Sequence, residues 1–97
     1  MFDLPMDTAS EQRQYRMFRK ELLRNGFTML QYSVYYRALP NRAGGKKYEK
    51  NIKRFLPTHG EVRLISVSEK QFNDMKILVG DRSKQESLVG SKELVII

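Results

Sequence analysis

The sequence lacks several residue types on which common protein chemistries depend. Its 97 residues include no cysteine and one histidine. Disulfide bonds and thiolate metal sites are therefore excluded, which fits a reducing compartment. No apolar run approaches the about 20 residues of a membrane-spanning helix, and the amino terminus is too short and too acidic for a signal peptide. We expect a soluble protein of the cytoplasm.

The inventory of catalytic groups is equally thin. The single histidine, His59, lies in the turn Pro57-Thr58-His59-Gly60 without a second histidine near it, and we interpret it as a solvated loop residue. Ser33 has no visible base, so a nucleophilic triad is not supported. The run Gly44-Gly45-Lys46-Lys47 lacks the strand spacing and the Ser/Thr of a phosphate-binding P-loop, although its lysines can still touch phosphate.

Positive charge is abundant and unevenly placed. The net charge is +7, and residues 10–54 contribute +9 through twelve Lys/Arg against three glutamates, which leaves −2 for the remainder. Such asymmetry favours a polyanion such as nucleic acid as partner. The alternative is a solvated helix surface that is basic for solubility alone.

The first half of the chain predicts a helix, a strand and a second helix. Thr8 to Glu11 has capping-box spacing and Asn25-Gly26 is a stop signal, which predicts a helix over residues 8–25. Residues 27–37 contain no breaker and predict one long strand. A second helix is expected after Asn41, with its first turn loosened into a basic loop by Gly44-Gly45. The expected buried stripes of the two helices are Tyr15, Phe18, Leu22 and Leu23, and Tyr48, Ile52, Phe55 and Leu56.

The second half predicts shorter elements. We expect a strand over residues 61–67, a helical turn capped by Ser68, a strand over 76–79, a mobile connector over 81–92 and an apolar terminal strand over 93–97. The tail is suited to pairing with a sheet edge, its own or a partner's. Together with a strand at the amino terminus, this order predicts one α+β domain over residues 1–97, a ferredoxin-like sandwich with two helices on one face of an antiparallel sheet.

One carboxylate stands out. Asp3 lies between apolar residues, directly before Leu4-Pro5, where a buried unpaired charge would be costly. Three interpretations stay open, namely a metal ligand, a partner of a turn or helix cap, and a solvated terminal residue. Magnesium takes one or two carboxylates, and one chain offers only Asp3 and Asp7 near this point. A two-fold dimer would bring two copies of Asp3 together.

The residues as a set resemble a known family. The quoted segments, in chain order, are Phe2-Asp3-Leu4-Pro5, the basic run from Arg13 to Lys20, Gly26-Phe27-x-Met29-x-Gln31-Tyr32-Ser33-Val34-Tyr35, Leu56-Pro57-x-x-Gly60-x-Val62-Arg63, and Lys70-Gln71-Phe72 with Met75. Their order and spacing resemble the Cas2 family, small CRISPR-associated proteins of the adaptation module, and look most similar to those of type II systems. Relatives usually carry several apolar residues before the Phe-Asp pair, so we expect the first strand to be short here.

The resemblance implies a ferredoxin-like homodimer in a prokaryotic cytoplasm. It implies that the dimer bridges two dimers of the CRISPR integrase and helps to insert short duplex DNA as new spacers. It also implies an alternative activity, a Mg²⁺-dependent or other divalent-metal endonuclease on single-stranded RNA or on DNA, with Asp3 of each protomer as the catalytic metal ligand. The family's terminal strand commonly joins the partner's sheet, which maps onto Leu94, Val95, Ile96 and Ile97.

Two hypotheses of different class follow, with a third kept in reserve. The first is a structural role in which basic side chains hold duplex DNA by its phosphates without reading its sequence. Its candidate contacts are Arg13, Arg16, Arg37, Arg42, Lys46 and Lys47. The second is the metal-dependent nuclease centred on paired Asp3. The third is an RNA-binding module that stacks bases on Tyr32 or Tyr35.

Overall fold

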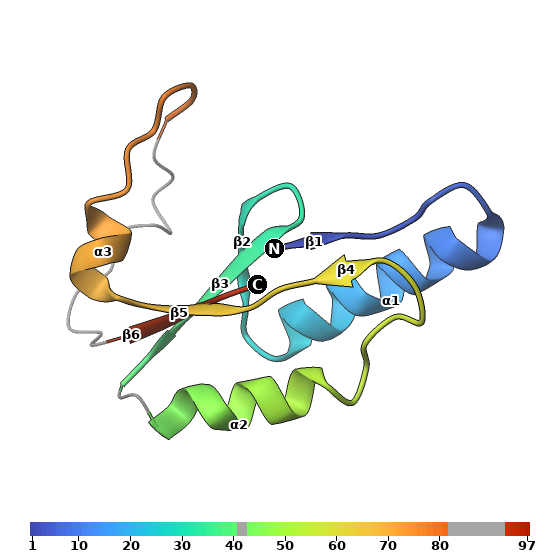
Figure 1. The fold of residues 1–97 in the computed structure, drawn as a ribbon, viewed down its shortest axis with the longest axis horizontal. Coiled ribbons are helices and arrows are strands. Elements are labelled where there is room, and N and C mark those ends of the chain that lie inside the picture. The colour runs from blue at the N-terminus through green and yellow to red at the C-terminus, as the bar shows by residue number, and fades with distance from the viewer. Residues whose placement is uncertain (41–42, 82–92) are drawn as a thin grey trace.

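The computed structural model describes residues 1–40, 43–81 and 93–97, and it has a mixed α+β architecture (Figure 1). Helices alternate along the chain with strands that pair into antiparallel sheets, which is consistent with the predicted ferredoxin-like fold. No helix within the described ranges is long and apolar enough to cross a membrane. The elements are β1 (Phe2–Asp3), α1 (Ala9–Arg24), β2 (Thr28–Gln31), β3 (Val34–Leu39), α2 (Ala43–Ile52), β4 (Glu61–Val62), β5 (Ile65–Ser68), α3 (Glu69–Asn73) and β6 (Glu93–Ile96).

Helix α1 confirms the expected capping box. The Thr8 hydroxyl accepts from the Glu11 N–H at 3.1 Å, and the Glu11 carboxylate accepts from the Thr8 N–H at 2.9 Å. These two bonds satisfy donors that every helix start leaves without an intrahelical partner. The buried stripe is Tyr15, Phe18 and Leu22, whereas Leu23, which we expected to join it, is exposed.

The single strand predicted over residues 27–37 is wrong, because the chain reverses in its middle. Strands β2 and β3 pair antiparallel around a tight hairpin at Tyr32 and Ser33. Ser33 adopts a φ of +62°, a left-handed conformation that Gly, Asn or Asp usually supplies. The hairpin allows Tyr35 and Tyr36 to be buried on opposite faces of β3.

The main sheet has the strand order β2-β3-β6-β5, and β6 lies in its middle, antiparallel to both neighbours. The terminal strand thus pairs within its own sheet here, away from any edge. The strand predicted over residues 61–67 is divided into β4 and β5, because its neighbour changes along the way. Strand β4 pairs with β1, and β5 pairs with β6.

Helix α2 corrects the expectation of a loop at Gly44-Gly45, because both glycines are helical. A Cβ at Gly45 would meet the Leu39 side chain at 3.6 Å, an ordinary contact, so α2 packs closely on β3. Such packing outweighs the poor helix propensity of glycine. The proposed cap at Asn41 lies outside the described residues.

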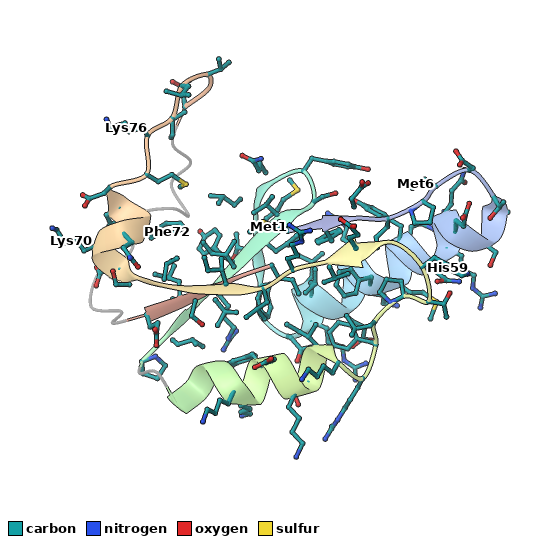
Figure 2. The ribbon with its side chains drawn as sticks, viewed as in Figure 1. Met1, Met6, His59, Lys70, Phe72 and Lys76 are labelled. Carbon is teal, nitrogen blue, oxygen red and sulfur yellow. The ribbon has the colours of Figure 1, made fainter. Side chains whose placement is uncertain are left out.

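Apolar side chains gather on both faces of the sheet. Helices α1 and α2 cover one face, where Phe18, Leu22, Tyr35 and Ile52 are among the buried core residues. A smaller cluster on the other face contains Tyr36, Phe72 and Leu94, and Figure 2 shows Phe72 on the side of α3 toward the sheet with Lys70 on its outer side.

The strand predicted over residues 76–79 is also wrong. After α3, which the Ser68 hydroxyl caps as expected, the chain turns away from the sheet, as Figure 1 shows. Leu78 and Val79 are 90% and 96% exposed, and the segment forms no strand. Of the predicted connector over 81–92, residues 82–92 lie outside the described ranges.

Candidate functional site

Asp3 is exposed on the face of the sheet opposite helices α1 and α2. Along β1, Phe2 is buried in the helix-side core, and Asp3 points the other way because successive strand residues alternate. No hydrogen bond or ion pair engages its carboxylate anywhere in the described parts of the chain. The cap interpretation of Asp3 therefore finds no support in the contacts.

Directly across from Asp3 lies a second carboxylate that the sequence analysis missed. Asp3 and Glu61 are paired positions of β1 and β4, so their side chains leave the same face. The Arg63 guanidinium lies 3.8 Å from the Glu61 carboxylate, but both side chains are about three-quarters exposed, and such a pair contributes little energy. The sequence did contain a signal for Glu61, because this residue begins the predicted strand directly after Gly60.

A glycine turn brings these two carboxylates together. Gly60 has a φ of +96°, and a Cβ there would lie 2.6 Å from the Asp3 carbonyl oxygen and 2.8 Å from the Leu4 side chain. The same turn is fixed on α1, because the N–H and hydroxyl of Thr58 both donate to the Gln14 side-chain oxygen at 3.2 Å. The turn therefore sets the register in which Glu61 pairs with Asp3.

The donor set suits a hard cation with few protein ligands. Within the described ranges there is no group of three or more His, Cys, Asp or Glu side chains that could hold a metal. Magnesium, however, is often held by one or two carboxylates together with water and substrate phosphate. Asp3 and Glu61 supply that number from one chain, while Asp7 lies at the start of α1, where its N–H donates to Glu11.

The cations predicted to contact phosphate lie on the helices, away from Asp3. Arg13 and Arg16 are exposed on α1, and Lys46 and Lys47 are exposed near the start of α2. Both helices cover the same face of the sheet. The basic surface and the carboxylate pair therefore occupy opposite sides of the molecule.

Two further candidates differ from these four. The half-buried guanidinium of Arg37 donates to the Asn25 carbonyl at 3.0 Å and lies 4.5 Å from the centre of the Tyr48 ring. Arg37 thereby links the residue after α1 to β3 and α2, so its guanidinium is engaged within the fold and does not project freely into solvent. Arg42 lies outside the described residues.

The tyrosines proposed for base stacking are not equivalent. Tyr35 is 1% exposed and cannot receive a base without unfolding. Tyr32 is 68% exposed and stacks on Tyr15, with ring centroids 5.9 Å apart. The Tyr32 hydroxyl donates to the Met6 sulfur at 3.6 Å, and its hydrogen-bonding interaction with Tyr15 raises the pKa of Tyr32 above its ordinary value.

His59 is exposed, as expected for a loop residue. Figure 2 shows it at the end of the molecule where α1 begins, away from Met1.

Comparisons with known proteins agree on one family. The family model described as "CRISPR associated protein Cas2" matches residues 1–75. A protein named "CRISPR-associated endoribonuclease Cas2" from Ligilactobacillus salivarius is 46% identical over 85 residues, which are 88% of this chain and 84% of that protein. Proteins of the same name from Acidovorax ebreus and Streptococcus mutans are 39% and 45% identical, over 98% and 84% of this chain and 93% and 77% of theirs.

Proposed function

This chain belongs to the Cas2 family of CRISPR-associated proteins, and from that premise we propose that it acts in CRISPR adaptation as a homodimer that holds duplex DNA and bridges dimers of the integrase. The observation that carries this proposal is the set of exposed cations on the two helices that cover one face of the sheet. The helices present these cations on a rigid support, and the Asp3 carboxylate faces away from them.

The spacing of the cations suits a phosphate backbone. Arg13 and Arg16 are one turn apart on α1 and therefore share a face. No ion pair to an acid is formed by Arg13, Arg16, Lys46 or Lys47 within the described ranges, so these side chains are available to a polyanion. Contacts of this kind position duplex DNA and release counterions without reading sequence.

A salt titration of duplex binding tests the proposal. For the double variant Arg13→Glu/Arg16→Glu we expect weaker binding of a short duplex, because two phosphate contacts are lost and two repulsions are added. The slope of log affinity against log salt should fall by about 2, roughly one unit for each lost contact. Fluorescence anisotropy with a labelled duplex at several salt concentrations measures both quantities.

The matched control is Lys70→Glu/Lys76→Glu, which changes the net charge equally on the α3 side of the molecule (Figure 2). It should lower affinity less and leave the slope near that of the parent protein. Equal losses in the two double variants would assign binding to net charge alone and contradict a specific helix surface.

A second candidate function is a metal-dependent endonuclease, favoured by the carboxylate pair and by the endoribonuclease names of the relatives. In this proposal Asp3 and Glu61 hold a divalent cation such as Mg²⁺, and the cation stabilises charge on the phosphate being cleaved. A two-fold dimer would place the Asp3 of the partner subunit on the same site.

Isosteric removal of charge tests the nuclease. Asp3→Asn should abolish Mg²⁺-dependent cleavage of a single-stranded RNA and of a short DNA, because the chief ligand is lost. Glu61→Gln should raise the Mg²⁺ concentration required, and Asp7→Asn should behave as the parent protein. Each variant is purified in parallel, and cleavage that survives Asp3→Asn at the parental rate identifies a contaminating nuclease.

A further inference from the structure

Tyr32 is the most exposed aromatic side chain of the described ranges. It is 68% exposed, whereas Tyr48 and Phe55 are half-buried and the other aromatic side chains are buried. Its ring stacks on the buried ring of Tyr15, with centroids 5.9 Å apart and planes inclined by 21°. A single stacked neighbour covers one face of a ring, so the other face of Tyr32 is open to a further ring.

The stacked pair of Tyr15 and Tyr32 is held in place by contacts from several elements. The Tyr32 hydroxyl donates to the Met6 sulfur at 3.6 Å, and the Tyr15 ring packs against Phe2 with centroids 6.0 Å apart. The Ser33 carbonyl accepts from the Phe2 N–H at 3.1 Å, which ties the tip of the β2–β3 hairpin to β1 (Figure 1). An aromatic side chain fixed in this way loses little conformational freedom when a ligand stacks on it.

Two arginines of α1 border the stacked pair. The Gln12 side-chain amide donates to the Met6 carbonyl at 3.1 Å, so this flank of α1 lies against the segment that holds the hairpin tip. Arg16 is four residues after Gln12 and Arg19 is four residues after Tyr15, so each lies one turn along the same flank. Both arginines are exposed, and neither forms an ion pair with an acid within the part of the chain that the structure describes. An open aromatic face is thus bordered by positive charge.

We propose that the open face of Tyr32 is a stacking site for an unpaired nucleobase, and that Arg16 and Arg19 contact phosphates of the same strand. Sites for single-stranded nucleic acid combine aromatic rings, on which bases stack, with cations that follow the backbone. A base inside a duplex is covered on both faces by its neighbours, so this site takes a single-stranded segment. The alternative is that Tyr32 does no more than cover Tyr15.

This site lies beyond the proposed duplex-binding surface and does not require it, although Arg16 belongs to both. That the unpaired base lies next to a bound duplex is an extension that rests on the proposed function. The two can be separated, because a blunt duplex offers charge without an unpaired base. Tyr32→Ala should therefore leave the affinity for a blunt duplex unchanged.

A single introduced tryptophan tests stacking directly, because the sequence contains none. Tyr32→Trp keeps an aromatic ring at the site, and its fluorescence should be quenched when a single-stranded oligothymidylate binds, with EDTA present to prevent metal-dependent cleavage. An abasic strand of the same length carries the same phosphates and should leave the fluorescence near that of the free protein. Quenching by neither strand, or equal quenching by both, would overturn the proposal.

The matched control is Met17→Trp, which places the reporter at a position on α1 that is 56% exposed and lies outside the stacked pair. Its fluorescence should change little with either strand. The same base-dependent quenching at both positions would mean that bases contact any exposed ring on α1, and it would contradict a specific site at Tyr32.

Affinities measured by fluorescence anisotropy with the same two strands, labelled, complete the test. The parent protein should bind the oligothymidylate roughly 10-fold more tightly than the abasic strand, in line with the usual effect of stacking one base. Tyr32→Phe should keep this preference and Tyr32→Ala should lose it, which makes the comparison a double-mutant cycle between ring and base. A parent protein without the preference would refute the stacking site even if Tyr32→Ala failed to fold. Loss of blunt-duplex binding by the parent would instead contradict the proposed function alone.

Discussion

At the scale of single residues, Asp3 is positioned by the backbone of a residue far along the chain. Gly60 allows its turn to pass within van der Waals distance of the Asp3 carbonyl, in a left-handed conformation. A similar dependence holds at Gly26, where a side chain would collide with the Arg37 guanidinium. At Gly60 the absence of a side chain leaves room for Asp3 and Leu4, and at Gly26 it leaves room for the Arg37 guanidinium.

Gly60→Ala should destabilise the protein by more than about 1 kcal/mol, because strain at positive φ adds to the collision with Asp3 and Leu4. For a domain of this size that corresponds to a fall of roughly 4–8 °C in Tm for each kcal/mol. Gly80→Ala is the control, since its φ is +103° but nothing lies within 4 Å of the added Cβ. Equal falls in Tm would show that the close approach to Asp3 contributes nothing.

At the scale of elements, the helices are set by local signals and the strands by their neighbours. The starts of α1 and α3 follow from capping boxes that involve residues three apart. By contrast, the Lys76–Val79 segment has the composition of a strand but forms none, because none of the strands in the described ranges lies beside it to supply a ladder.

Thr8→Ala should lower the free energy of unfolding by about 1 kcal/mol, because the first turn of α1 loses its side-chain acceptor. Ser10→Ala is the control, since Ser10 is exposed within α1 and alanine is the better helix former. Urea denaturation followed by circular dichroism measures both free energies. A Thr8→Ala protein as stable as the parent would mean that the capping box is not formed in solution.

At the scale of the whole molecule, the amine of Met1, which donates to the Arg63 carbonyl between β4 and β5, couples stability to pH. The Met1 amine is half-buried between the two sheets, and this burial lowers its pKa from 8.0 to about 6. Between these values the unfolded chain binds more protons than the folded one, so the free energy of unfolding rises as pH increases from 6 to 8.

Urea denaturation at pH 6, 7 and 8 measures this rise. Because solvent surrounds the half-exposed amine, the free energy of unfolding should rise with pH less steeply than it would if one full proton were released on folding. Acetylation of the amine should remove its contribution while His59 is retained, so the difference between the two samples isolates Met1. An acetylated protein with the same pH dependence would contradict the assignment.

Patterns within the sequence were enough for a large part of this molecule. The apolar periodicity of residues 8–25, the capping residues Thr8 and Ser68, and the apolar tail predicted elements that the structure confirms. The exposed charges of Arg13 and Arg16 could likewise be placed on a helix from spacing alone, whereas Lys46 and Lys47 follow two glycines that predicted a basic loop and are helical in the structure. These features depend on neighbours a few residues apart, whose interactions local propensity and helical spacing describe.

Only the tertiary structure decided which distant segments meet. It divided residues 27–37 at Ser33, placed β6 in the middle of the sheet, and set Glu61 opposite Asp3. The physical reason is that a strand can pair with any edge of matching polarity and register. The choice among edges depends on competition across the whole chain, so the sequence by itself determined the strands and helices available, and packing determined their partners.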